Sequence, residues 1–365
     1  MAGFKVTRIS EGPVKPASAT PEETLPLAWV DRYPTHRGLV ESMHIFRSGA
    51  DAAPAVIRAA LAKALAFFYP LAGRIVEGEQ AGCPAIRCTA DGVYFAEAQA
   101  DCTLEDVRFL ERPLLLPKED LVPYPGDDRW PVEPHNTIMM MQFPNPNIKP
   151  GPLPELPVLA LDYVVLDFPT PYIDDLKRQY KAHSGKFCSG FDVLTAKLWQ
   201  CRTRALALDP TTEVKLCFFA SVRHLLKLDR GYYGNSIFPV KMSAPAEKVL
   251  ASSIMEVVDM IREAKDRMAV EFFRFAKEEI DQDPFQMTFN YESIYVSDWS
   301  KLGFSEVDYG FGPPMFAGPL VNNDFIASVV ILKAPLPLDG TRMLASCVTK
   351  EHSEEFARGM KEDLP

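Results

Sequence analysis

The sequence predicts a mixed α/β protein of two domains, and three observations lead to that prediction. The chain has 365 residues, and because domains typically span roughly 100–200 residues, about two cores are expected. Helical and strand-like hydrophobic patterns alternate along both halves of the chain. Between these halves, residues 143–154 are so rich in proline that neither a helix nor a regular strand is expected there.

Composition and charge exclude several classes of protein. Hydrophobic residues make up 47% of the chain and charged residues 24%, which is typical of a globular protein. The net charge is −10, and no basic run offsets it, so we expect no nucleic acid partner. Neither a signal sequence in residues 1–20 nor an apolar run of about 18 residues is found. We therefore expect a cytoplasmic protein without a membrane partner.

The seven cysteines are scattered and include no Cys-x-x-Cys pair. This spacing argues against both a disulfide framework and a structural zinc site. We expect reduced thiols, no metal and no permanently bound cofactor.

The first half is predicted to combine one long helix with short strands. Its clearest element is a helix over residues 52–69, where Val56, Leu61, Leu65 and Phe68 fall near one face, and which Pro70 ends. Asp91-Gly92 between two short apolar runs predicts a β-hairpin. The predicted strands of this half are residues 39–46, 85–88, 93–96 and 137–142.

The proline-rich stretch divides the chain into residues 1–142, a linker of residues 143–158, and residues 159–365. The second half is again predicted to be α/β, with a longest helix over residues 249–275. Its other predicted helices are residues 171–183 and 189–208, and its predicted strands are residues 159–166, 217–221, 237–242, 293–298, 327–332 and 343–348.

The segment Asp308-Tyr309-Gly310-Phe311-Gly312 alternates glycines with aromatic residues, which suits a tight turn packed under large rings. Together with the preceding residues 297–307, it resembles the Asp-Phe-Gly-Trp-Gly signature of plant BAHD acyl-CoA-dependent acyltransferases. Phe311 stands where that family usually has tryptophan, so an aromatic ring is kept but the indole N–H is lost.

Three further stretches resemble the same family. They are Tyr69-Pro70-Leu71-Ala72-Gly73-Arg74, the helical segment of residues 189–199, and Ser221-Val222-Arg223 together with Tyr233-Gly234-Asn235. The resemblance covers nearly the whole chain apart from the linker. It is strongest to grass members that use hydroxycinnamoyl-CoA donors.

The resemblance implies two chloramphenicol-acetyltransferase-like domains and a channel between them, in a monomer. Acyl-CoA would be the co-substrate and an alcohol the acceptor. The family's motif histidine would take the acceptor's proton, which suits an imidazole pKa of about 6.5. The resemblance also implies a structural ion pair between Asp308 and Arg223. Ser297, Trp299 and Lys301 are candidate CoA contacts.

The family's catalytic motif, His-x-x-x-Asp, is missing from this chain. Four residues after each of the six histidines stands Val40, Ser48, Met139, Phe187, Leu228 or Phe356, and never aspartate. In the family, a strand resembling Met140-Met141-Gln142 continues toward the motif, whereas here Gln142 passes straight into the proline linker. The pattern indicates loss of one contiguous block, so the N-terminal domain is expected to be incomplete.

No residue is assigned as catalytic in place of the missing histidine. His135 is nearest in sequence to the lost block and is the candidate surrogate base, although a lone histidine before a strand is more often a solvated loop residue. His44 is expected to pack within its strand, and His224, which follows Arg223, is a further candidate at the edge of the channel. Three interpretations remain open: an acyltransferase with impaired or lost catalysis, a non-catalytic CoA-binding or regulatory protein, and a truncated splice or gene-model product.

Overall fold

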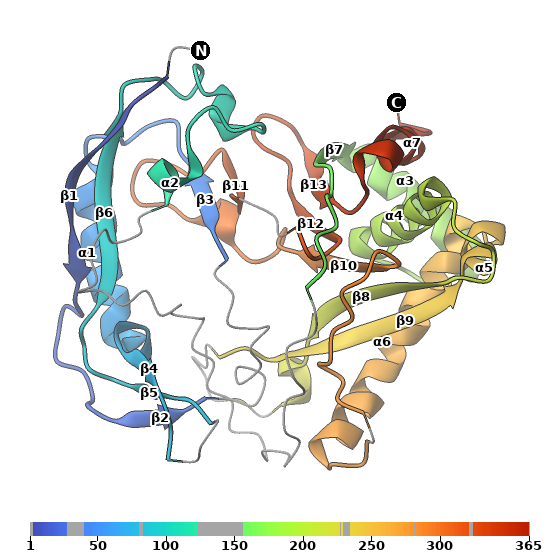
Figure 1. The fold of residues 1–365 in the computed structure, drawn as a ribbon, viewed down its shortest axis with the longest axis horizontal. Coiled ribbons are helices and arrows are strands. Elements are labelled where there is room, and N and C mark those ends of the chain that lie inside the picture. Colours follow the sequence, from blue (N-terminus) through green and yellow to red (C-terminus); the bar gives the residue numbers. More distant parts are fainter. Residues whose placement is uncertain are drawn as a thin grey trace.

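The computed structural model describes residues 3–27, 40–79, 83–122, 156–226, 228, 234–280, 282–320 and 324–364. Two halves lie beside each other, the N-terminal half built mainly from residues 3–122 and the C-terminal half from residues 156–364 (Figure 1). The expected junction at Gln142 and Phe143, the predicted strand of residues 137–142 and His135 lie outside the described residues, as does almost all of the expected linker.

A six-stranded sheet forms the C-terminal half, with strand order β7-β13-β12-β10-β8-β9. β10 runs parallel to both β8 and β12, and the remaining neighbours are antiparallel. The strands are β7 (Val164–Pro169), β8 (Glu213–Ser221), β9 (Ile237–Pro245), β10 (Ser293–Asp298), β12 (Ser328–Lys333) and β13 (Gly340–Ser346).

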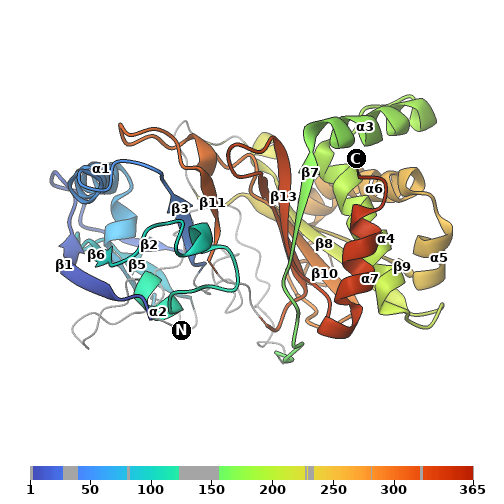
Figure 2. The same ribbon diagram turned by 90° about the horizontal axis from the view of Figure 1, so that it is seen from above.

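Five helices cover the face of this sheet that points away from the N-terminal half (Figure 2). Alternation along the strands sends Leu166, Leu216, Val296 and Met343 into the layer between sheet and helices, where they join one large apolar cluster. The helices are α3 (Thr170–Ser184), α4 (Gly190–Leu206), α5 (Ala246–Ala251), α6 (Ile254–Ala276) and α7 (Lys350–Lys361).

The single helix predicted over residues 249–275 is two helices, α5 and α6, so that prediction is wrong in its detail. Ser253 begins α6 with a capping box, because its side chain accepts from the N–H of Glu256 while the Glu256 carboxylate accepts from the N–H of Ser253. This reciprocal bonding favours a new helix start over continuation of α5.

The N-terminal half consists of small sheets around one long helix. Its elements are β1 (Val6–Val14), β2 (Thr24–Pro26), β3 (Ser42–Ile45), α1 (Ala53–Phe67), β4 (Arg74–Val76), β5 (Ala85–Arg87), β6 (Val93–Ala100) and α2 (Lys118–Leu121). β1 pairs with β6, and β2, β5 and β4 form a three-stranded sheet.

The hairpin predicted at Asp91-Gly92 is therefore wrong, since β5 and β6 belong to different sheets. The turn residues are placed as expected, and Gly92 has a positive φ of 90°. However, the N–H of Gly92 donates to the carbonyl of Ala72, and β6 continues along β1. An Asp-Gly pair predicts that the chain turns, but it does not determine which strands pair. Strand pairing depends on residues far away in the sequence.

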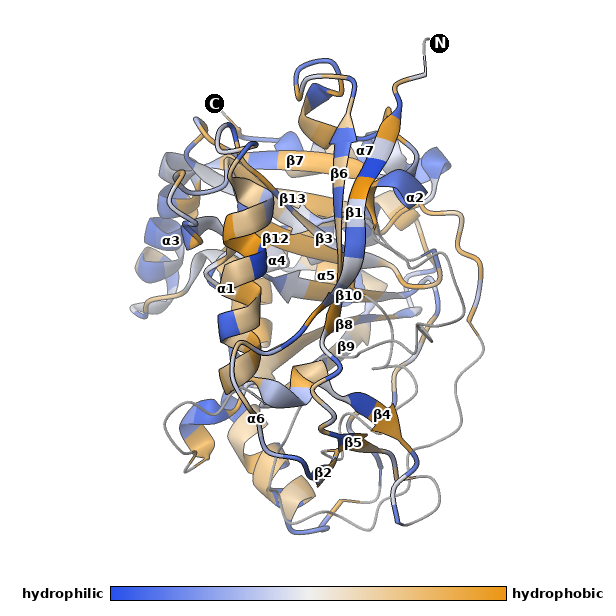
Figure 3. Ribbon diagram, turned by 90° about the vertical axis from the view of Figure 1, so that its left-hand side faces the viewer, coloured by the Kyte–Doolittle hydropathy of each residue, from blue (hydrophilic) through white to orange (hydrophobic). Residues whose placement is uncertain are grey.

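α1 is apolar around most of its circumference, yet Leu65 is its one buried residue. Phe67 at its end is 79% exposed. In Figure 3 the helix lies on the outer side of the N-terminal half and is coloured as hydrophobic over most of its length. The described N-terminal half holds two small clusters of three buried residues each, around Ile86 and around Leu65.

One strand of the C-terminal sequence pairs within the N-terminal half. β11 (Phe316–Pro319) runs antiparallel to β3, with Ala317 opposite His44. The expected division at residues 143–158 therefore does not separate the two halves completely, because residues 316–319 return to the N-terminal half. Among the described residues, no helix has the length and apolar character needed to cross a membrane.

Candidate functional site

The face of the six-stranded sheet that points toward the N-terminal half carries charged and apolar side chains in cross-strand rows. The pairing places Asp167 opposite Arg342, and Val165 opposite Leu344, on this face. Leu344 aligns through Val330 with Ser297 on β10. Because side chains alternate along a strand, these residues share the face that the helices leave uncovered.

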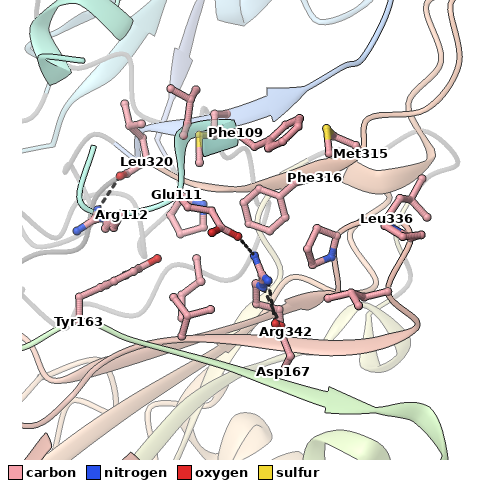
Figure 4. A pocket seen from close by; sticks show the side chains of 18 of the residues that line it. Phe109, Glu111, Arg112, Tyr163, Asp167, Met315, Phe316, Leu320, Leu336 and Arg342 are labelled. Atoms are coloured by element: carbon pink, nitrogen blue, oxygen red, sulfur yellow. Dashed lines mark hydrogen bonds and ion pairs between the residues drawn. The ribbon is translucent and has the colours of Figure 1, made fainter. Parts of the chain in front are cut away.

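A cavity of about 610 Å³ lies between this face and the N-terminal half (Figure 4). Its size lies within the range of small-molecule sites, roughly 300–1,000 Å³. The cavity is lined by Met43, Arg47, Phe109, Leu110, Glu111, Arg112, Tyr163, Val165, Asp167, Met315, Phe316, Pro319, Leu320, Pro335, Leu336, Pro337, Leu338, Arg342 and Leu344. The lining is largely apolar, and it includes two arginines, Arg342 and Arg112, that each contact other residues of the cavity.

Arg342 forms the first cluster with two carboxylates. Its Nε and Nη2 donate to the two oxygens of Asp167 at 2.7 and 2.8 Å, and its Nη1 reaches Glu111 at 3.3 Å. Burial alone would lower the pKa of Arg342, but these carboxylates outweigh it and raise the pKa. Arg342 is therefore fixed by Asp167, whereas the more exposed Glu111 is its weaker partner.

Arg112 forms the second cluster with an aromatic ring. Its guanidinium lies 4.4 Å from the ring centroid of Tyr163, and its Nη2 donates to the carbonyl of Leu320 at 2.6 Å. Burial raises the pKa of Tyr163, although Arg112 opposes that rise. The hydrogen bond from Arg112 to Leu320 joins the N-terminal half to the segment after β11.

No histidine is among the described residues that line the cavity. Met43 on β3 faces the cavity, so its neighbour His44 points to the other side of the strand, where it packs 5.5 Å from the Phe304 ring. Burial lowers the pKa of His44. His183 bonds Asp259, and His352 bonds Tyr291 in the C-terminal half.

The motif of residues 308–312 forms a tight loop packed on the N-terminal half. Oδ1 of Asp308 accepts from the N–H groups of Gly310 and Gly312 at 2.7 and 3.0 Å, and both glycines have positive φ. The Phe311 ring lies 5.2 Å from that of Phe46, and its carbonyl accepts from Ser48 Oγ. The loop thus connects the end of β3 to the approach to β11.

The structure does not bring Asp308 and Arg223 together as an ion pair. The Asp308 carboxylate accepts hydrogen bonds from N–H groups of its own loop, and an Nη of Arg223 donates to the carbonyl of Gly234. The expected pair is thus replaced by two local structures. An aspartate two residues before a glycine readily bonds backbone N–H groups of its own turn, and this local bonding competes with a distant arginine.

The candidate CoA contacts gather at the C-terminal end of β10. Nε1 of Trp299 donates to Ser297 Oγ at 3.0 Å, and the N–H of Trp299 donates to the carbonyl of Ile331. The Trp299 ring packs edge-on against Phe304. Lys301 is exposed in the following turn. Ser297 and Trp299 are therefore brought together beside the cavity face, whereas Lys301 makes no such contact with them.

The charged residues of the cavity were missed in the sequence. A signal was nevertheless present, since Asp167 interrupts the apolar strand Val-Val-Leu-Asp-Phe-Pro and Arg342 interrupts Gly-Thr-Arg-Met-Leu-Ala-Ser. A single charge within an apolar strand predicts a buried pair or a site. Which two strands lie beside each other is not visible in the sequence.

Comparison with known proteins identifies similar sequences over most of the chain. The model of the Transferase family matches residues 4–132 and 151–363. Acyl transferase 9 of Oryza sativa subsp. japonica is 79% identical over 420 aligned positions, covering 100% of both chains. Since this chain has 365 residues, 55 of these positions have no counterpart in it. Myricetin 3-O-glucosyl 1,2-rhamnoside 6'-O-caffeoyltransferase AT2 of Crocosmia x crocosmiiflora is 30% identical, covering 98% of this chain and 99% of that one.

Solved structures share the fold. Vinorine synthase superposes with a TM-score of 0.65 at 16% identity and 96% coverage of both chains. TRI101 of F. sporotrichioides, complexed with coenzyme A and T-2, superposes with a TM-score of 0.65 at 14% identity, covering 92% of this chain and 97% of that one. The predicted mixed α/β fold is thereby confirmed. Residues 133–150, where the family match is interrupted, include the junction at Gln142 and Phe143.

Proposed function

Because this chain belongs to the BAHD family of plant acyl-CoA-dependent acyltransferases, we propose that it binds an acyl-CoA between its halves and that acyl transfer to an alcohol is impaired or lost. The observation that carries this proposal is the cavity of about 610 Å³, whose described lining includes no imidazole. We further propose a monomer that acts in the cytoplasm.

Acyl transfer from a thioester to an alcohol requires a group that removes the hydroxyl proton. The alcohol oxygen attacks the thioester carbonyl, the carbon–sulfur bond breaks, and the CoA thiolate takes up a proton. A positioned base contributes roughly 10²–10⁴ in rate. The carboxylates in the described lining of the cavity are Asp167 and Glu111, and both contact Arg342. Their oxygens are therefore already engaged by the Arg342 guanidinium.

The proposed acyl group is hydroxycinnamoyl. Phe109, Phe316 and Tyr163 present aromatic rings to the cavity, as suits a planar aromatic acid. The similar Crocosmia protein is named as a caffeoyltransferase, and caffeoyl is a hydroxycinnamoyl group. Ser297 and Trp299, with Lys301 beyond them, are the proposed CoA contacts. The loop of Asp308, Gly310, Phe311 and Gly312 is proposed as structural, with Arg223 holding the neighbouring Gly234 segment.

The experiment incubates the purified protein with p-coumaroyl-CoA and a set of alcohols. Thiol release and ester formation are followed by chromatography for the wild type and for His135→Ala. We expect ester formation to be absent, or at least 100-fold slower than for Acyl transferase 9 under the same conditions. Rapid turnover that His135→Ala abolishes would overturn the proposal of impaired catalysis and assign His135 as the base.

A second candidate function is a non-catalytic CoA-binding protein. The observation that favours it is that the cavity is present although its described lining contains no imidazole. Calorimetric titration with CoA separates the two: binding without turnover supports the binding protein, and binding with slow turnover supports the impaired enzyme. A truncated product remains the third alternative. It predicts that thermal unfolding is not cooperative, and the sequence of the transcript across the codons for Gln142 and Phe143 would show whether the missing block is real.

A further inference from the structure

The cavity between the two halves contains a stacked pair of side chains, Arg112 and Tyr163 (Figure 4). Arg112 belongs to the N-terminal half, and Tyr163 directly precedes β7 in the C-terminal half. The guanidinium lies 4.4 Å from the ring centroid, and its hydrogen bond to the carbonyl of Leu320 holds it in place. The pair is therefore positioned by the fold at the junction of the two halves.

Both members of the pair keep hydrogen-bond donors that the described part of the chain does not use. The bond to Leu320 takes up one N–H of Arg112 and leaves the others of its guanidinium available. The Tyr163 hydroxyl points into the cavity in Figure 4 and makes no hydrogen bond to a described residue. A stacked guanidinium presents its N–H groups in a fixed plane, and this arrangement suits a carboxylate, which can accept two parallel hydrogen bonds.

The cavity also has a surplus of positive charge. Its described lining contains three arginines, Arg47, Arg112 and Arg342, and two carboxylates, Glu111 and Asp167. Both carboxylates contact Arg342. Neither Arg47 nor Arg112 forms an ion pair with any residue that the structure describes. A ligand with a single negative charge would balance the charges of this lining.

The surroundings of the Tyr163 hydroxyl favour an anion as its partner. Burial raises the pKa of Tyr163, Arg112 and Arg342 oppose that rise, and Glu111 adds to it. Both guanidinium groups therefore act on the position of the phenol oxygen. Because the pKa of Tyr163 is raised above its ordinary value of about 10, the hydroxyl is protonated at neutral pH and can donate a hydrogen bond.

We propose that Arg112 and Tyr163 bind a carboxylate of the acceptor, so that the acceptor is a hydroxy acid. This inference rests on the proposed function. The carboxyl group of a hydroxycinnamoyl donor is bound in the thioester, and the acyl group therefore brings no free carboxylate. The acceptor's carboxylate accepts hydrogen bonds from the guanidinium of Arg112 and from the hydroxyl of Tyr163, and it anchors the acceptor beside this pair.

The experiment measures binding to the purified full chain by calorimetry with two matched probes, 4-(hydroxymethyl)benzoate and 4-(hydroxymethyl)benzamide. The probes share a ring and a hydroxyl group and differ in the negative charge. The test variants are Arg112→Gln and Tyr163→Phe, the second of which keeps the ring that stacks. The matched control is Arg58→Gln, because Arg58 also lies over an aromatic ring, 4.6 Å from the centroid of Phe95, but outside the described lining of the cavity. CoA binding and thermal unfolding are measured for every variant.

We expect the wild type and Arg58→Gln to bind the benzoate at least about tenfold more tightly than the benzamide. Arg112→Gln should abolish this preference, and Tyr163→Phe should reduce it about threefold or more. Binding of the benzamide and of CoA should be unchanged in both test variants. If Arg112→Gln does not fold, the reduction in Tyr163→Phe decides the test.

Equal binding of the two probes by the wild type would overturn this inference, although CoA binding would leave the proposed function intact. The inference is also wrong if Arg112→Gln weakens CoA binding and not benzoate binding, because the pair would then bind a phosphate of the co-substrate. A loss of preference in Arg47→Gln alone would likewise contradict the assignment to Arg112 and Tyr163. If the wild type prefers the benzoate but binds no CoA, the proposed function fails and the carboxylate site stands.

Discussion

The two halves of this molecule differ in how they bury apolar residues. The C-terminal half has one continuous six-stranded sheet and one large core cluster, in which Trp199 and Phe356 are almost fully buried. The described N-terminal half has small sheets and two clusters of three buried residues. Because burial of apolar surface is the main stabilising term in folding, we infer that stability is concentrated in the C-terminal half.

Two helices make the comparison concrete. α4 carries several charged residues, yet it buries nearly all its residues from Asp192 to Leu206, including Lys197 and Arg202. α1 is far more apolar and buries Leu65 alone. A helix that is apolar all round is expected within a core. Burial is therefore decided by the layers around a helix and not by the helix's own composition.

The largest effect is expected for Phe238→Ala. Phe238 is 2% exposed, and its ring contacts those of Phe272, Phe275 and Phe285 at 5.6–5.9 Å. Its removal should lower the free energy of unfolding by about 3–5 kcal/mol, measured by urea denaturation. The matched change Phe95→Ala in the N-terminal half should cost about 1 kcal/mol. Equal losses would contradict the proposed difference between the halves.

An intermediate effect is expected for Asp192→Asn. Asp192 accepts from the N–H and Oγ of Ser189 and pairs with Lys265. Burial would raise the pKa of Asp192, but Lys265 and Ser189 outweigh burial and lower it. We expect a loss of about 2 kcal/mol in the free energy of unfolding at pH 7.

That loss should depend on pH in a defined direction. A carboxylate whose pKa is lowered by folding stabilises the protein fully above its unfolded pKa of about 3.9, and this stabilisation disappears as the pH falls through the folded value. The difference between wild type and Asp192→Asn should therefore shrink below about pH 4. Asp175→Asn, at an exposed carboxylate, is the control and should change stability much less. An Asp192→Asn deficit that persists undiminished at pH 2 would show that charge is not its cause.

The smallest effect is expected for Phe67→Ser at the end of α1. Since the side chain is 79% exposed, its replacement should change the free energy of unfolding by no more than about 0.5 kcal/mol. Chemical denaturation at two protein concentrations is the measurement. A loss well above this limit that grows with concentration would indicate that the apolar face of α1 is covered in solution by another copy.

Local elements of the fold could be predicted from the sequence, whereas their partners could not. The periodicity of Val56, Leu61 and Leu65 predicted α1, and apolar runs located β8, β9 and β10 in outline. β11 was missed because Phe316–Pro319 includes a glycine and a proline, which are poor strand formers, and it is held by β3 more than 270 residues away. The hairpin at Asp91-Gly92 was wrong for the same reason, since pairing is a property of the assembled fold.

The candidate site was predicted in part. The motif at Asp308 indicated the family correctly, but the ion pair to Arg223 was not found, because Asp308 bonds its own turn. Arg342, Asp167 and Glu111 come from distant parts of the chain, and only strand order brings them together. Short sequence motifs predict hydrogen bonds between residues that are close in the sequence. Contacts between side chains 175 or 231 positions apart require the three-dimensional fold.

The pairing of β3 with β11 also has a consequence for how this protein can be divided. A fragment beginning at residue 159 would carry residues 316–319 without the strand that receives them, and a fragment ending at residue 122 would leave β3 without its neighbour. We therefore expect that neither fragment folds independently, either when it is expressed alone or when it is fused to another protein. Co-expressed pieces, by contrast, could reassemble through this short strand pair and the Phe46–Phe311 contact beside it.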